Sequence, residues 1–115
     1  MNRQIYPERP SDNEEVRSIG IITEIIRFDI HEVEQDFECD EVEYNHKEDL
    51  SPSDYGPMVS CIIRGKYSED AVEAILNNYL SDPTNTRYEA EFNMLQSWRA
   101  EAKERARSIL GLLEE

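Results

Sequence analysis

The sequence predicts an α+β fold: a bulged antiparallel β-hairpin, or small sheet, followed by three α-helices packed on it. Two observations predict this class. Residues 26–31 and 36–44 alternate between apolar and polar side chains, with the period of two that is typical of strands. Residues 51–113 instead repeat apolar side chains at three- and four-residue spacing, which is typical of amphipathic helices.

The length of 115 residues is that of one domain, because two domains would each be too small to bury an adequate core. Residues 1–18 contain Pro7 and Pro10 in a polar stretch, so we expect an extended or flexible arm. Residues 19–115 should form the single domain, with the β-hairpin in residues 19–46 and the helices in residues 51–113.

The predicted hairpin turns at residues 34–35. In strict register, carboxylates of the second strand would face apolar residues of the first. One extra residue near positions 40–41 removes this conflict and brings Phe28 opposite Val42. We therefore expect a β-bulge at that place in the second strand.

The first helix should follow Leu50, with Ser51 or Ser53 as its cap and Pro52 in its first turn. Gly65 is placed to end it with a left-handed residue.

The second helix should begin after the capping residue Ser68 and stop at residues 82–83, an Asp-Pro pair. The third helix should begin near residues 84–86 and run to Leu110, with Gly111 at its end. Its apolar stripe comprises Tyr88, Phe92, Leu95, Ala102, Ala106, Ile109 and Leu113.

The formal net charge is −14, and residues 1–50 contribute most of it, with fifteen Asp and Glu against five Lys and Arg. This sign disfavours direct binding to nucleic acid and to anionic membranes. It favours a protein partner, particularly a basic one, and a homo-oligomer is the alternative. Met1–Pro10 is polar, so we expect no signal peptide and a cytoplasmic or virion-associated protein.

No cofactor or metal is expected. A calcium loop starting at Asp36 would need glycine where Glu41 stands and glutamate where Lys47 stands. His31, His46 and Cys39 are too few and too scattered for a zinc site, although a metal-dependent enzyme around the two histidines is the weakest alternative. Cys61 falls beside the stripe of the first helix and is expected to be a small buried hydrophobe.

Two surfaces are candidate interaction sites. Tyr88, Phe92, Trp98 and Arg99 lie together on the third helix, and Trp, Tyr and Arg dominate interface hot spots. Trp98 is equally explained as a residue that closes the edge of the core. The second candidate is an acidic face of the hairpin: Asp29, Glu38, Asp40 and Glu43.

Residues 55–68 (YGPMVSCIIRGKYS) and 96–103 (QSWRAEAK) resemble small uncharacterised proteins from bacterial prophage regions, often encoded near tail genes. The resemblance extends over about residues 50–107. It implies an assembly or interaction component and no assigned catalytic residues.

The expected function is therefore that of a non-catalytic interaction or assembly component, in a phage or prophage module. It would use the long C-terminal helix and the edge of the hairpin to bind its partner. The alternative is an acidic mimic of DNA that occupies the basic groove of a nucleic-acid-binding protein.

Overall fold

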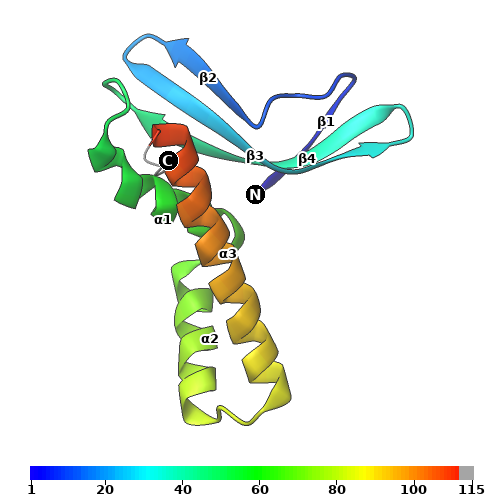
Figure 1. Ribbon diagram of the computed structural model, residues 1–115, viewed down its shortest axis with the longest axis vertical. Coiled ribbons are helices and arrows are strands. Elements are labelled where there is room, and N and C mark those ends of the chain that lie inside the picture. Colours follow the sequence, from blue (N-terminus) through cyan, green and yellow to red (C-terminus); the bar gives the residue numbers. More distant parts are fainter. Residues whose placement is uncertain (112–115) are drawn as a thin grey trace. The chain divides into compact units, whose positions relative to one another are not determined.

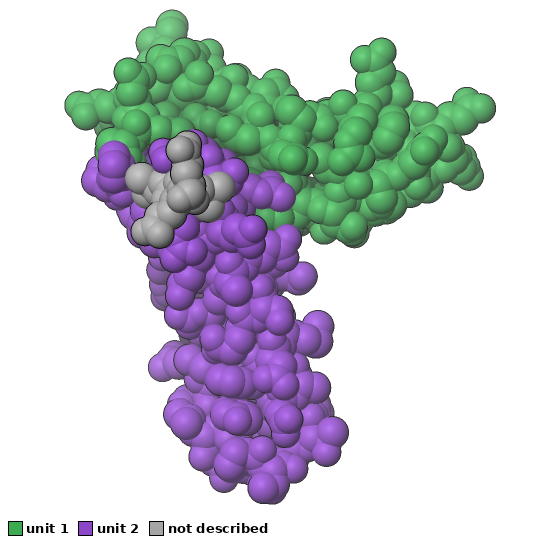
Figure 2. All heavy atoms as spheres, in the orientation of Figure 1, with its two compact units in different colours: residues 1–51 green, residues 52–115 purple. Residues whose placement is uncertain are grey.

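A computed structural model describes residues 1–111 and confirms the α+β class, with a four-stranded antiparallel sheet and three α-helices (Figure 1). The chain forms two compact units that meet in sequence at Ser51 and Pro52 (Figure 2). The first unit contains all the strands and the second contains all the helices. Leu113, which we placed on the stripe of the third helix, lies outside the described residues.

Four strands form the sheet unit, in the spatial order β1-β4-β3-β2. Their bounds are Asn2–Tyr6 for β1, Asn13–Ser18 for β2, Ile21–Val33 for β3 and Asp36–His46 for β4. The predicted hairpin is thus the central β3–β4 pair, and both of its outer edges are occupied.

The N-terminal arm requires a correction. We expected residues 1–18 to be extended or flexible and separate from the domain, but β1 pairs with β4 and β2 pairs with β3. The two strands were missed because their side chains are mostly exposed and show little apolar pattern. Pairing through the backbone, which sequence patterns do not report, recruits them to the sheet.

The bulge exists, but it lies in β3 and not at residues 40–41 of β4. Between Phe28 and His31 the register shifts by one residue, so Phe28 lies opposite Asp40 and not opposite Val42. Asp29 in the bulge has a positive φ of 54°, a conformation that Asp adopts more readily than most residues. The turn at residues 34–35 is confirmed, with Glu34 at a φ of 57°.

This register decides which side chains share a face of the sheet. Ile26 lies opposite Val42, and both are buried. Their sequence neighbours Arg27 and Glu41 also lie opposite each other, on the other face, and both are buried as well. Arg27 stands at a polar position of the alternating residues 26–31, which predicts exposure, so its burial is a third correction within the sheet unit.

The first helix begins later than expected and ends later. A short 3₁₀ turn, η1 (Pro52–Asp54), precedes α1 (Tyr55–Lys66). Asp54 occupies the capping position of α1, where we expected Ser51 or Ser53, and its side chain makes no capping hydrogen bond. Gly65 lies inside the helix, and the residue that follows α1, Tyr67, is extended.

The other two helices agree closely with the sequence. Ser68 caps α2 (Glu69–Ser81), where its hydroxyl accepts a hydrogen bond from the Ala71 amide at 3.1 Å. Asn85 caps α3 (Thr86–Leu110), and Gly111 ends it in the left-handed conformation with a φ of 68°. Both α1 and α2 pack along α3 within the helical unit.

Candidate interaction site

The apolar stripe of α2 is incompletely covered. No residue of this helix is buried, and Val72, Ile75 and Leu76 are all half-exposed. Leu80, one turn further along, is 76% exposed. A helix in a folded domain normally hides its apolar stripe against the core. The helix α2 therefore presents more apolar surface than its packing on α3 uses.

A hollow of about 320 Å³ lies beside this surface. The residues that line it come from α1, from α2 and from the link between them: Ser60, Ile63, Arg64, Tyr67, Glu69, Val72, Glu73 and Leu76. We call it the α1–α2 groove. Its size lies at the lower end of the range for ligand pockets, and it suits a few apolar side chains.

The rim of the α1–α2 groove is charged. Arg64 of α1 forms an ion pair with Glu69 of α2, which offsets both charges. Glu73 also lines the groove and, within residues 1–111, takes part in no ion pair. The helix α2 carries three acidic residues and no Lys or Arg. The rim thus has a net negative charge around an apolar floor.

The structure places Trp98 inside the helical unit. Its side chain is 5% exposed, and its indole Nε1 donates a hydrogen bond to the Ile62 carbonyl oxygen of α1 at 3.2 Å. The Lys66 ammonium lies 4.8 Å from the centre of the ring. Of the two explanations we gave for Trp98, the structure favours the residue that closes the core.

The other candidates on α3 do not form an exposed patch. Tyr88, Phe92 and Arg99 are each half-exposed. Phe92 stacks on Tyr79 of α2 with ring centres 4.1 Å apart, so it joins the two helices. None of the four predicted residues lines the α1–α2 groove.

The candidate acidic face is also divided. Glu38 and Asp40 lie on one face of β4, and both form ion pairs with Arg3 of β1 at 3.1 Å. Glu43 points to the opposite face because of its odd position in the strand. Asp29 stands in the bulge. These four carboxylates therefore do not form one array.

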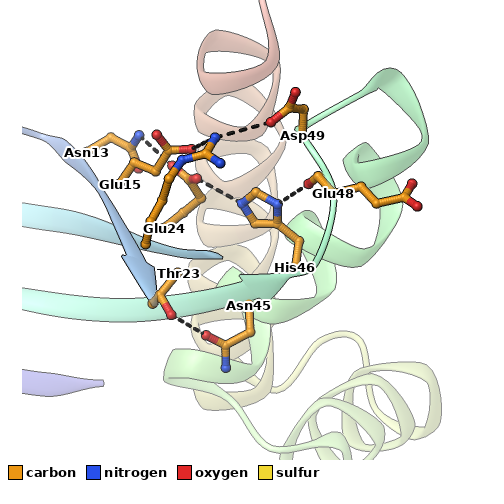
Figure 3. Close-up of polar contacts among 9 residues, drawn as sticks. Asn13, Glu15, Thr23, Glu24, Asn45, His46, Glu48 and Asp49 are labelled. Atoms are coloured by element: carbon orange, nitrogen blue, oxygen red, sulfur yellow. Dashed lines mark hydrogen bonds and ion pairs between the residues drawn. The ribbon is translucent and has the colours of Figure 1, made fainter. Parts of the chain in front are cut away.

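A buried polar cluster joins three strands near the end of the sheet unit (Figure 3). His46 of β4 contacts the Glu24 carboxylate of β3 through Nε2 at 2.9 Å and the Glu48 carbonyl oxygen through Nδ1 at 2.6 Å. The Asn13 amide of β2 donates to the same Glu24 carboxylate at 3.1 Å. We call these four residues the His46 cluster.

Hydrogen bonding in the His46 cluster restricts its chemistry. Both ring nitrogens of His46 face oxygen atoms, so a proton must lie between Nε2 and the Glu24 carboxylate for both contacts to be hydrogen bonds. The side chains of His46 and Glu24 are only 6% and 2% exposed. Neither nitrogen has a lone pair directed at solvent, so this histidine is poorly placed to act as a general base.

A second buried cluster centres on Arg27 of β3. Its Nε donates to Glu41 of β4 at 2.7 Å and its Nη2 donates to Glu14 of β2 at 2.8 Å. Its Nη1 donates to the Ser11 carbonyl oxygen at 3.0 Å, and the Tyr6 hydroxyl of β1 donates to Glu41. This Arg27 cluster therefore joins both edge strands to the central pair.

The Arg27 cluster contains two groups whose pKa the structure changes. Burial alone lowers the pKa of Arg27, but its hydrogen bonds to Glu14, Glu41 and Tyr6 outweigh burial and raise it. The hydrogen bond to Glu41, and then burial, raise the pKa of Tyr6. Arg27 therefore stays charged and Tyr6 stays protonated, the forms in which they donate the hydrogen bonds that join the strands.

Possible metal ligands and the two cysteines lie within the described residues. Within residues 1–111, no group of three or more His, Cys, Asp or Glu side chains is arranged to hold a metal ion. Burial raises the pKa of Cys39 and of Cys61, which disfavours the reactive thiolate. Cys39 is buried and Cys61 is half-exposed.

Comparison with known proteins identifies no relative: no protein-family model, no curated protein and no solved structure matches this chain. Among the helices of residues 1–111, none is long and apolar enough to cross a membrane.

Sequence reasoning missed the α1–α2 groove, although a signal for it was present. The stripe of α2 includes Ile75, Leu76, Tyr79 and Leu80. A stripe of this kind normally packs against the core, so it also indicates where apolar surface is left if the packing is incomplete. Which part remains accessible depends on how the helices pack.

Proposed function

We propose that this chain is a non-catalytic protein-interaction component that binds its partner in the α1–α2 groove. The observation that carries the proposal is the apolar stripe of α2, which has no buried residue and borders an apolar hollow. Grouped exposed apolar surface with a polar rim is typical of interaction sites. Single exposed apolar residues, such as Ile5 on β1, need no such explanation.

This proposal moves the contact surface away from the residues that the sequence favoured. Trp98 already fills the interior of the helical unit, so it is not offered to a partner. Strand addition to the β3–β4 hairpin has less support, because β1 and β2 occupy its edges. A role in a prophage assembly and a cytoplasmic or virion location stay predictions.

The acidic mimic of DNA has less support than the groove. Such a mimic needs carboxylates that follow the spacing of phosphates along one surface. Glu38 and Asp40 are paired with Arg3, and Glu43 points to the other face of the sheet. Acidic charge is plentiful, but the candidate carboxylates are not arrayed in this way.

Site-specific photo-crosslinking in cells tests the proposal. A photoreactive amino acid in place of Ser60, on the rim of the groove, should capture a defined protein. The same amino acid in place of the exposed Ala90 of α3 should not.

Two further variants show whether the capture depends on the groove. Leu76→Glu puts a charge into the groove, and Leu80→Glu makes the same change on the same helix outside it. Both variants carry the photoreactive residue at position 60. We expect capture to disappear with Leu76→Glu and to persist with Leu80→Glu. Capture that survives Leu76→Glu refutes the proposal, as does the absence of any product from position 60.

A further inference from the structure

We infer that the partner's contact segment is a basic amphipathic helix, with apolar side chains in the α1–α2 groove and a Lys or Arg beside Glu73. The inference rests on the proposed function and names the kind of partner that the groove fits. Recognition of this type places the apolar face of one helix in a groove between others.

The charges that line the groove determine the sign of the partner. Arg64 and Glu69 are paired with each other, so their charges largely cancel. Glu73 keeps a negative charge at the edge of the apolar floor, and the helix that carries it has no basic residue. A cationic side chain beside Glu73 would therefore gain a pairing that is not satisfied within residues 1–111.

The charge of the whole chain acts in the same direction. At a net charge of −14, the chain repels a second copy of itself and attracts basic proteins over several ångströms of solvent. A second copy is therefore disfavoured as the occupant of the groove. The expected partner is a different protein that carries positive charge.

The dimensions of the groove set the pattern of the partner's apolar residues. The lining residues of α2 run from Glu69 to Leu76, which spans about 10 Å, or two helical turns. Two turns of a partner helix place two or three apolar side chains on one face, at three- and four-residue spacing. The groove of about 320 Å³ suits side chains in that number.

A displayed library of random peptides, about 15 residues or roughly four helical turns long, tests this inference on the full chain. Selection uses the native protein, and counter-selection uses Ser60→Arg, in which a long side chain from an exposed position fills the groove. Together the two steps retain the peptides that need the groove. We expect the retained peptides to show apolar residues at helical spacing and an excess of Lys and Arg over Asp and Glu.

Charge reversal then tests the role of Glu73 with a selected peptide. Glu73→Lys should weaken binding by roughly three- to tenfold, whereas Glu89→Lys, the same change at an exposed position of α3, should have an effect below about twofold. Raising the salt concentration from about 50 mM to about 500 mM should weaken native binding more than binding to Glu73→Lys, which keeps the attraction of the remaining negative charge but lacks the pair at position 73.

The outcomes separate this inference from the proposed function. Groove-dependent peptides without an excess of basic residues, or equal effects of the two reversals, refute the basic helix and leave the groove as the interaction site. A selection that yields no groove-dependent peptide refutes the basic helix too. If photo-crosslinking at Ser60 also fails, the proposed function is refuted with it.

Discussion

Arg27 holds the four strands together, and its replacement should destabilise the sheet unit severely. Its side chain is 2% exposed and that of Glu41 is 10% exposed. In Arg27→Met, the Glu41 carboxylate stays buried and keeps only the Tyr6 hydroxyl among the polar partners of the Arg27 cluster. Breaking a buried pair from one side costs about 3–5 kcal/mol, because an uncompensated charge remains.

Two comparison variants show how the loss of stability in Arg27→Met depends on burial and on pairing. Glu14→Gln neutralises a partner of Arg27 whose side chain is 50% exposed, so it should cost at most about 1 kcal/mol. The double variant Arg27→Met/Glu41→Leu removes both buried charges and should regain most of the stability that Arg27→Met loses.

Hydrogen exchange measured amide by amide is the suitable assay, because it reports the stability of the sheet unit and of the helical unit individually. In Arg27→Met we expect protection to fall throughout β1–β4, with β1 and β2 affected first because they are the edge strands. The helices α1–α3 serve as an internal reference. A loss below about 1 kcal/mol, or a double variant less stable than Arg27→Met, would contradict the reasoning.

Three further predictions concern other contacts. The pKa of Tyr6 is raised, so its protonated form stabilises the fold below about pH 10 and this contribution is lost at higher pH. Tyr6→Phe should therefore reduce the loss of unfolding free energy at alkaline pH. An unchanged pH profile would count against this role of Tyr6. His46→Ala leaves the buried Glu24 carboxylate with only the Asn13 amide among its partners in the His46 cluster. It should cost about 3 kcal/mol in chemical denaturation, most of it regained with leucine at both positions 24 and 46; no recovery would argue against a buried pair. Ser68→Ala removes the cap of α2 and should cost about 1 kcal/mol, measured by helix-amide exchange; an unchanged exchange rate would show that the cap is dispensable.

The helices were the most predictable part of this protein. The cap at Ser68, the end at Gly111 and the stop after Ser81 each depend on a few neighbouring residues. Such local signals can be read from one stretch of sequence. Where the signal was weaker, at the start of α1 and at Gly65, the prediction was less accurate.

The sheet was less predictable because its stability depends on distant residues. The bulge could lie in either strand of the hairpin, since an extra residue in either one shifts the register between them. The structure selects β3, where Asp29 accepts the left-handed conformation and Arg27 comes opposite Glu41. That pairing buries two charged side chains, which polar positions in an alternating pattern do not predict.

The sequence by itself determined the α+β class, the central hairpin and the limits of the second and third helices, because alternation, helical spacing and caps are local properties. Only the tertiary structure decided that residues 2–6 and 13–18 complete the sheet, that Arg27 and Glu24 are buried, and that Trp98 lies in the interior while α2 keeps apolar surface exposed. Burial and edge pairing depend on which elements meet, and a pattern along one segment does not contain that information.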